Sequence, residues 1–219
     1  MKKCLIIPTL NEENSIKQVL ARIPHSFDVY VIDGVSTDQT CEIAQHHGAK
    51  IILEKRKGKG HAVQTALARL RKRYEIIIMI DGDNTYNPRD APTFVTELRH
   101  ADIVFGKRCL RPNTMSFFHR VGNYALSLFA SFLYNKKITD LCTGYIGFGK
   151  SALSKISISA TGFDLEADVF SEAVRNNLRV AEVPISYSTR LSTSKLNAFS
   201  DGIKIVRTLI RKRFFSKIG

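Results

Sequence analysis

The chain has 219 residues, of which 44% are hydrophobic and 24% are charged, a composition typical of one large globular domain or of one domain with an appendage. Thirty-three Lys and Arg against 20 Asp and Glu leave a net charge of +13, so the candidate partners are anionic: nucleic acid, a membrane surface or a phosphorylated substrate. The four cysteines are scattered without a Cys-x-x-Cys pair, which argues against a zinc site or a disulfide framework and suits a reducing cytosol.

Strands and helices are predicted to alternate over the first hundred residues. Short apolar runs typical of buried strands lie at residues 4–7, 29–32, 49–53, 76–80 and 102–105. Segments with a helical pattern lie between them, at residues 11–22, 37–47, 59–72 and 89–99. This alternation predicts an α/β fold, with a largely parallel sheet and helices on both faces.

The pattern changes beyond residue 110. Residues 115–134 form a long, aromatic-rich helical segment, and residues 180–187 are predicted as a strand, with Pro184 at a sheet edge or a bend. The longest apolar stretch, 124–134, is far shorter than a membrane span, which needs about 20 residues. We also expect no secretory signal, because the chain runs directly into its first strand. These features favour a protein that is soluble or peripheral to a membrane.

The C-terminal segment at residues 203–219 carries six basic residues and no acid among its apolar side chains. At helical pitch it has one apolar and one cationic face, the composition of a helix that lies in a membrane interface. The alternative is a basic helix that packs on the domain. Nucleic acid is not the expected partner, because no recognised nucleic-acid-binding module accompanies the charge.

The most informative segment is the predicted strand 76–80 with the turn that follows it. Asp81 and Asp83 stand two residues apart directly after the apolar run, with Gly82 between them. Ligands of open α/β sheets gather at the carboxyl ends of the strands, and two carboxylates there suit Mg²⁺ or Mn²⁺ carrying a diphosphate. A strand followed by a polar Asp-Gly turn is the alternative.

Polar residues also follow the three earlier strands, at residues 8–13, 33–38 and 55–60. Each of these ends has a structural explanation by itself, since polar residues there can cap a helix or lie in a solvated loop. Together they describe a pocket for a nucleoside diphosphate. A carboxylate would bind a ribose or base, a Gly/Lys loop would approach the phosphates, and Asp81 and Asp83 would hold a metal ion.

In order and spacing, these motifs resemble those of the family 2 glycosyltransferases of GT-A (Rossmann-like) fold. The segments within the nucleotide-binding part that carry the resemblance are 8–12, 33–40, 58–60 and 81–83. Further segments are similar to those of the branch of dolichyl- and polyprenyl-phosphate mannose or glucose synthases, at 106–108, 120–123, 140–145, 182–185 and 194–196.

The resemblance implies inverting transfer of a hexose from GDP-mannose or a UDP-hexose to a polyprenyl or dolichyl phosphate, with Mg²⁺ or Mn²⁺. The residues that would bind the nucleotide sugar, the last two with the metal, are Pro8, Thr9, Glu12, Asp33, Lys59, Asp81 and Asp83. Those that would hold the acceptor phosphate are Arg108, Arg120 and Arg190. Asp83, Arg108 and Arg120 are the expected catalytic residues. Because a lipid phosphate is already an anionic nucleophile, positioning and charge neutralisation would replace a strong general base.

The resemblance also implies an organisation of the chain. Residues 1–200 would form the GT-A domain, with a nucleotide-sugar core at 1–110 and an acceptor-side region at 111–200, followed by a basic amphipathic tail at 201–219. The expected location is the cytoplasmic face of a membrane, reached through the apolar and basic segments or through a membrane-anchoring partner protein.

The chain departs from the pattern of that branch at three positions. Gly34 stands where many relatives have a second acid, Thr85 where a Gln helps to bind the metal, and Ile146 where an Arg follows the Gly-aromatic pair. Two alternatives therefore stay open: the same donor chemistry on a glycan or glycolipid acceptor, and a basic membrane- or nucleic-acid-binding protein without catalysis.

Three acids after Phe163 also allow two interpretations. Asp164, Glu166 and Asp168 are spaced by two residues, so that on a helix Asp164 and Asp168 share a face and Glu166 does not. Acids are favoured at a helix N-terminus by the helix dipole. Alternatively, Asp164 or Glu166 faces the sugar hydroxyls or the acceptor.

Overall fold

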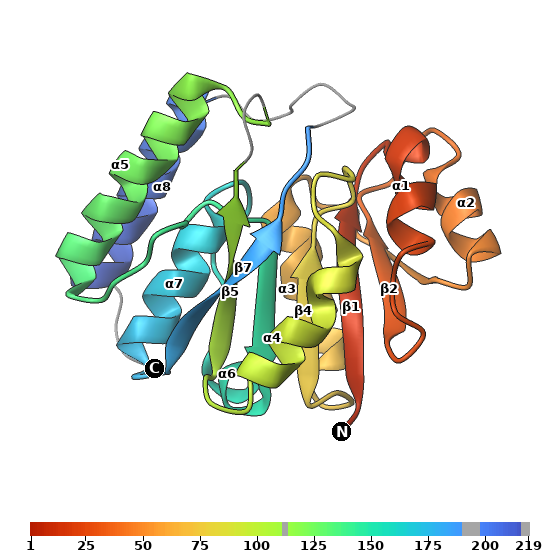
Figure 1. The fold of residues 1–219 in the computed structure, drawn as a ribbon, viewed down its shortest axis with the longest axis horizontal. Coiled ribbons are helices and arrows are strands. Elements are labelled where there is room, and N and C mark those ends of the chain that lie inside the picture. The colour runs from red at the N-terminus through yellow and green to blue at the C-terminus, as the bar shows by residue number, and fades with distance from the viewer. Residues whose placement is uncertain (111–113, 190–197, 216–219) are drawn as a thin grey trace.

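A computed structural model of the protein describes residues 1–110, 114–189 and 198–215 (Figure 1). Within these residues, seven strands form one sheet in the order β3-β2-β1-β4-β6-β5-β7. The strands are β1 (Lys3–Thr9), β2 (Asp28–Asp33), β3 (Lys50–Leu53), β4 (Ile76–Ile80), β5 (Ile103–Cys109), β6 (Tyr145–Gly149) and β7 (Val180–Ser186). The sheet is mostly parallel, as predicted, with β6 antiparallel to both of its neighbours.

Helices cover both faces of the sheet (Figure 1). They are α1 (Glu13–Leu20), α2 (Thr40–His46), α3 (Lys59–Leu70), the 3₁₀ helix η1 (Pro88–Asp90), α4 (Ala91–Glu97), α5 (Phe117–Tyr134), α6 (Lys150–Lys155), α7 (Leu165–Arg175) and α8 (Ala198–Phe214). All five residues of β4 are buried. Ile77 and Met79 pack into the core that contains residues of α3, α5, α7 and α8, whereas Ile76, Ile78 and Ile80 pack into the core under α1, α2 and α4. The alternation follows from the two-residue period of a strand, and it explains why β4 is apolar throughout.

Among the described strands, β6 is the one that the sequence pattern does not predict. It lies between β4 and β5, with Ile80 opposite Tyr145 and Phe105 opposite Ile146. Two of its five residues are glycines, and a Cβ added at Gly147 would lie 3.2 Å from side chains of α4. The glycines let α4 approach the sheet closely, and they also remove the β-branched signature by which a strand is recognised.

The predicted strand at 180–187 is β7, and it lies at the edge of the sheet. Pro184 therefore occupies an edge strand, as expected for a residue without a backbone N–H. The predicted strand at 102–105 is longer in the structure, because β5 pairs in parallel with β7 from Ile103 to Cys109.

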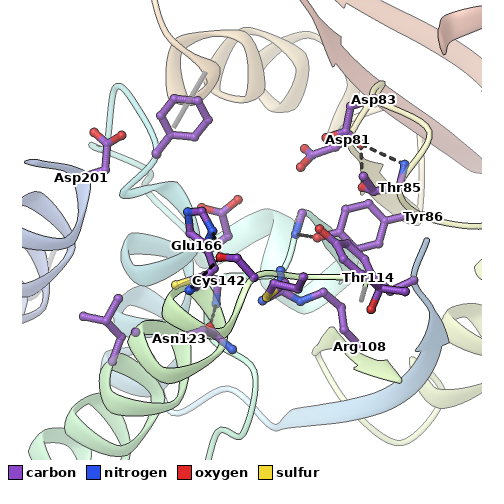
Figure 2. A pocket seen from close by; sticks show the side chains of 18 of the residues that line it. Asp81, Asp83, Thr85, Tyr86, Arg108, Thr114, Asn123, Cys142, Glu166 and Asp201 are labelled. Carbon is purple, nitrogen blue, oxygen red and sulfur yellow. Dashed lines mark hydrogen bonds between the residues drawn. The ribbon is translucent and has the colours of Figure 1, made fainter. Parts of the chain in front are cut away.

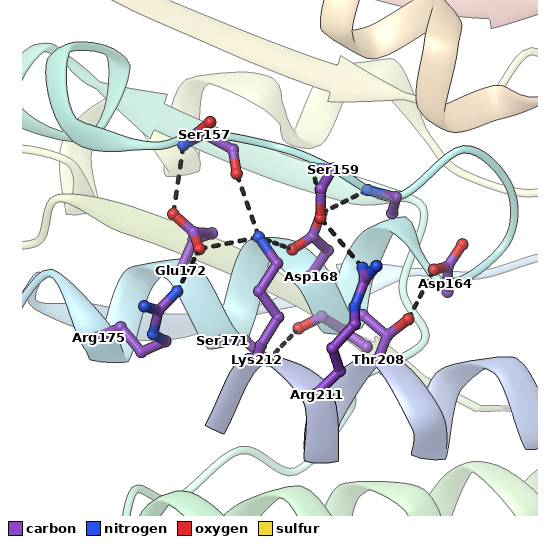
Figure 3. A network of polar contacts seen from close by, with 12 residues as sticks. Ser157, Ser159, Asp164, Asp168, Ser171, Glu172, Arg175, Thr208, Arg211 and Lys212 are labelled. Carbon is purple, nitrogen blue, oxygen red and sulfur yellow. Dashed lines mark hydrogen bonds and ion pairs between the residues drawn. The ribbon is translucent and has the colours of Figure 1, made fainter. Parts of the chain in front are cut away.

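The basic C-terminal helix begins at Ala198 and packs against α5 and α7, as the second of the two interpretations predicts. The Tyr134 hydroxyl donates to the Leu209 carbonyl oxygen at 2.9 Å. Figure 3 shows Lys212 of α8 between two acids of α7, with its Nζ 2.7 Å from Asp168 Oδ1 and 2.9 Å from Glu172 Oε1. Among the described residues, no helix combines the length and the apolar character that crossing a membrane requires.

Candidate active site

The carboxyl ends of β1 to β4 meet at one edge of the sheet, and a pocket with a volume of about 410 Å³ opens beside them (Figure 2). Of the residues predicted from the sequence, the pocket brings together Lys59, Asp81, Asp83 and Arg108. Four predicted residues lie outside the pocket lining. Pro8, Thr9 and Asp33 lie at the carboxyl ends of β1 and β2, and Glu12 is the N-cap of α1.

Asp81 lies where β4 ends, against the start of β6. Its backbone N–H donates to the Gly144 carbonyl oxygen at 3.1 Å. A Cβ added to Gly144 would overlap the Asp81 carboxylate. The carboxylate can therefore take this position only because residue 144 is a glycine, a requirement that the sequence motif around Asp81 does not reveal.

Lys59, the first residue of α3, is placed between two carboxylates. Its Nζ lies 2.6 Å from Asp81 Oδ1 and 2.7 Å from Glu166 Oε1, and its side chain is 12% exposed. Burial alone would lower the pKa of Lys59, but the two carboxylates outweigh it and hold this pKa above its ordinary value. Burial raises the pKa of Asp81 from 3.8 to about 6, with Lys59 opposing that rise and Asp83 and Glu166 adding to it.

Asp83 is buried and held by the residue two positions further on. Its Oδ1 accepts hydrogen bonds from the Thr85 backbone N–H at 3.1 Å and from the Thr85 hydroxyl at 2.6 Å (Figure 2). Thr85, where the resemblance predicted a departure from the expected Gln, thus orients the second carboxylate of the motif.

A second polar cluster joins the ends of β1 and β2. Asp33 is fully buried, and its carboxylate accepts from the Thr9 hydroxyl at 3.0 Å and from the Ser36 backbone N–H at 2.7 Å. Val35, which precedes Ser36, has a φ of 65°. This left-handed conformation is rare for a β-branched residue, and strained backbone of this kind is found preferentially at functional sites. Thr9 and Asp33, both predicted to bind the nucleotide sugar, therefore lie together.

Glu12 connects this cluster to the Asp81 turn. Its carboxylate accepts from the Ser15 hydroxyl at 2.8 Å, and the same hydroxyl lies 2.8 Å from the Gly82 carbonyl oxygen. A Cβ added to Gly82 would lie 2.9 Å from a methyl of Thr9. The two clusters are therefore contiguous along the carboxyl edge of the sheet, from β2 through β1 to β4.

Arg108 also lines the pocket and is paired with a buried acid. Its Nη2 and Nε lie 2.6 Å and 2.8 Å from the two carboxylate oxygens of Asp140, and both side chains are 7% exposed. The Tyr187 ring lies under the guanidinium at 5.3 Å, and Asn123 of α5 also donates to Asp140. This two-pronged pairing fixes the guanidinium in the pocket wall.

Of the other two predicted arginines, Arg120 is not among the residues that line the pocket. Arg120 lies exposed in the first turns of α5, and Arg190 lies outside the described residues.

The three acids after Phe163 have separate partners. Glu166 faces the pocket and Lys59, whereas Asp164 accepts from the Thr208 hydroxyl at 2.7 Å and Asp168 pairs with Lys212 (Figure 3). The predicted division of faces is confirmed, and Glu166 is the acid that reaches the site.

Two tyrosines that sequence reasoning missed also line the pocket. The Tyr86 hydroxyl accepts a hydrogen bond from the Gly144 backbone N–H at 2.7 Å, and the rings of Tyr86 and Tyr187 meet edge to face with centroids 5.3 Å apart. Tyr86 stands only three residues after Asp83, so the motif itself could have indicated it. Tyr187 directly follows β7, and its approach to Tyr86 depends on the sheet order.

The end of the pocket away from Asp81 is mainly apolar. It is lined from the segment before α5, from α5, from the segment before α7 and from α8, by Met115, Phe118, Leu126, Phe163 and Ile205, and the acid Asp201 of α8 also lines it (Figure 2). One cavity thus joins a charged end at Asp81 and Asp83 to an apolar end between helices, past Arg108.

Among the described residues, no three His, Cys, Asp or Glu side chains come together as a complete set of metal ligands. Asp81 and Asp83 offer two carboxylates on one turn, a donor set that fits Mg²⁺ or Mn²⁺ when diphosphate and water oxygens complete the coordination. Lys59, which forms an ion pair with Asp81, already supplies part of the positive charge that compensates these carboxylates.

Comparison with known proteins adds the family. The family model described as glycosyl transferase family 2 matches residues 4–157. Glycosyltransferase AglJ of Haloferax volcanii is 31% identical over 217 residues, which cover 95% of this chain and 71% of AglJ. Dolichyl-phosphate hexose transferase of the same organism is 32% identical over 214 residues, which cover 94% of this chain and 92% of that protein.

Solved structures match the fold over the whole chain. Glucosyl-3-phosphoglycerate synthase from Mycobacterium tuberculosis, in complex with Mn²⁺, UDP and glucosyl-3-phosphoglycerate, has a TM-score of 0.80 at 20% identity and covers 100% of this chain and 82% of its own. This likeness confirms the predicted GT-A fold.

Proposed function

Because this chain belongs to glycosyl transferase family 2, and is thus a nucleotide-sugar-dependent transferase, we propose that its acceptor is a polyprenyl or dolichyl phosphate. The transfer would be inverting, depend on Mg²⁺ or Mn²⁺, and take place at the cytoplasmic face of a membrane. The observation that carries the proposal is the continuous pocket that runs from the Asp81–Asp83 turn past Arg108 to a mainly apolar end between α5 and α8. The name of the dolichyl-phosphate hexose transferase from Haloferax volcanii supports the same acceptor class.

The donor would lie along the carboxyl edge of the sheet. Pro8, Thr9, Glu12 and Asp33 would surround the nucleoside, and the diphosphate would extend toward Asp81, Asp83 and Lys59. A divalent metal ion held by Asp81 and Asp83 would stabilise the negative charge of the departing diphosphate. The Mn²⁺ and UDP bound by the mycobacterial synthase support this arrangement.

The acceptor would enter from the apolar end, with its phosphate toward Arg108. A phosphate oxygen attacks the anomeric carbon while the bond from that carbon to the diphosphate oxygen breaks, and the nucleoside diphosphate leaves with the bonding electrons. The nucleophile is already ionised, so the pocket contributes orientation and positive charge rather than a base. Glu166, which pairs with Lys59, would accept hydrogen bonds from the hydroxyls of the hexose. Arg120 and Arg190 are proposed as further phosphate contacts.

A donor panel tests the proposal. Purified protein with Mn²⁺ or Mg²⁺ is mixed with GDP-mannose, UDP-glucose, UDP-galactose or UDP-GlcNAc, each with and without a short-chain polyprenyl phosphate, and nucleoside diphosphate release is measured. We expect release that requires both the metal and the lipid phosphate. The dephosphorylated polyprenol serves as the matched acceptor control, and it should give no release.

Two carboxylate variants separate the site from general effects of charge. Asp83→Asn is expected to lose at least about a hundredfold in activity, because it removes a charge that holds the metal. Asp28→Asn makes the same chemical change at the first residue of β2, away from the carboxyl ends of the strands where Asp83 lies. This control variant should keep activity. Donor binding without lipid-stimulated release would overturn the acceptor assignment and favour a glycan or glycolipid acceptor.

A further inference from the structure

The outward face of α5 carries a continuous apolar stripe. Phe117, Val121, Tyr124, Leu128 and Phe132 are 72%, 48%, 68%, 59% and 85% exposed, and their spacing of three or four residues places them on one side of the helix. Single exposed apolar residues are common, but five large ones in a row along one helix mark an interaction surface.

Helix α8, which packs beside α5 (Figure 1), extends this surface. Ile203, Ile210 and Phe214 are 40%, 37% and 65% exposed and recur at helical spacing on its outer side. The opposite side of α8 is occupied by its packing partners, because Ile205, Leu209 and Lys212 are buried. The exposed apolar side chains of α8 therefore do not serve to pack this helix against the domain.

Within the described residues, the exposed charged side chains of α5 and α8 are all basic. Their exposed charged residues are Arg120, Lys204, Arg207, Arg211 and Arg213, and Lys136 and Lys137 follow α5 directly. The acid that α5 and α8 contain in their described residues, Asp201, is buried and pairs with Lys204. Aromatic and aliphatic side chains flanked by cations are the composition of a surface that lies in the headgroup region of an anionic bilayer.

We infer that the α5–α8 surface binds an anionic lipid bilayer, with α5 in the plane of the interface and its stripe inserted at the boundary between headgroups and acyl chains. A second copy of the chain fits less well, because an isologous contact would oppose cations to cations. Phe118, Gly122 and Leu126, on the neighbouring flank of α5, line the apolar end of the pocket. This inference deepens the proposed function, on which it rests for the identity of the acceptor, and it places the pocket mouth at the bilayer.

The chain contains no tryptophan, so a single introduced one reports on its own surroundings. Phe132→Trp places the probe in the stripe, and Leu53→Trp places it at an exposed position on β3, the opposite edge strand of the sheet. With vesicles of phosphatidylcholine and about one third phosphatidylglycerol, emission at position 132 should shift to the blue and be quenched by brominated acyl chains. Emission at position 53 should not change.

A second pair of variants measures the contribution of the stripe. The double variant Leu128→Ser, Phe132→Ser should bind these vesicles about tenfold more weakly or worse, since it removes two inserted side chains. Leu53→Ser should bind like the wild type. Neither position in the double variant lines the pocket, so transfer to a water-soluble short-chain acceptor should be retained.

Three results would overturn the inference: no binding to anionic vesicles, binding that the double variant leaves unchanged, or a dimer in solution that the double variant makes monomeric. Vesicle binding that depends on the stripe, in a protein without lipid-phosphate transfer, would instead overturn the proposed function and leave this inference standing.

Discussion

At the scale of single residues, Lys59 balances the charge of the pocket. Lys59→Met would leave Asp81 and Glu166 as two neighbouring carboxylates without their shared cation. We expect the variant to lose about 3 kcal/mol of unfolding free energy, as is typical when one partner of a buried ion pair is removed. Urea denaturation measures this loss. Lys57→Met, two residues earlier at an exposed position, should change stability by less than about 0.5 kcal/mol; equal losses in both variants would contradict the assignment.

Gly144 is expected to be as important for donor binding as the carboxylate beside it. Gly144→Ala places a methyl group where the Asp81 carboxylate lies, so Asp81 must move. We predict that Mn²⁺-dependent nucleotide affinity falls about tenfold or more, measured by titration calorimetry. Gly122→Ala adds the same methyl to a pocket-lining position with no atom within 4 Å, and it should bind normally. Normal binding by Gly144→Ala would show that Asp81 is not required in this position.

The raised pKa of Asp81 predicts a dependence of stability on pH. Because the pKa of Asp81 is about 6 in the folded protein and 3.8 ordinarily, its contribution to stability is complete below about pH 4 and is lost as the pH rises through 6. The neutral side chain in Asp81→Asn does not titrate. We therefore expect the stability of the metal-free wild type, relative to this variant, to fall by about 2 kcal/mol between about pH 4 and pH 7. Urea denaturation at both ends of this range checks it, and a constant difference would contradict the raised pKa.

The residues of the site that could be predicted are those that share a short motif. Asp81 and Asp83 follow one strand directly, and Thr9 and Asp33 end two neighbouring strands, so local sequence and the parallel sheet bring them to one edge. Three further residues reach the pocket from distant parts of the chain: Gly144 just before β6, Tyr187 just after β7, and Glu166 in α7. Their positions depend on how distant elements pack, which no local pattern records.

At the scale of elements, Lys212 fastens α8 to α7. Its ammonium lies between Asp168, which is fully buried, and Glu172 (Figure 3). Lys212→Met should lose about 3–5 kcal/mol of unfolding free energy, because Asp168 would stay buried without its cation. Arg207→Met removes an exposed cation from the same helix and should cost less than about 0.5 kcal/mol. A small loss for Lys212→Met, measured by urea denaturation, would mean that α8 is held by its apolar contacts alone.

The elements that the sequence predicts well are those with strong periodicity. Strands β1 to β4, helix α3 and helix α5 lie within a few residues of their predicted bounds. Strand β6 is rich in glycine, and helix α7 is buried along most of its length, so neither shows the contrast between a polar and an apolar side on which prediction depends.

At the scale of the whole molecule, α8 shares the core of the domain. Ile205 and Leu209 belong to the same buried cluster as Phe170 of α7 and Ile77 of β4. Removing residues 198–219 is therefore expected to lower the unfolding midpoint by more than about 10 °C, measured by circular dichroism. A truncated chain that melts like the full chain would support the predicted division, in which residues 201–219 are a separable tail.

The position of β6 also has a consequence for how the protein is made. Strand β6 joins the half of the sheet that ends at β4 to the half that begins at β5, and it pairs with strands about 40 and 70 residues earlier in the chain. Pairings of such long sequence separation form late, both in refolding and during synthesis from the N-terminus. The first half of the sheet emerges from the ribosome with the β4 edge unpaired. Asp81 can take its folded position against Gly144 only after Gly144 and β6 have been synthesised. The position of Asp81, on which the proposed donor site depends, is therefore complete only after Gly144 has been translated.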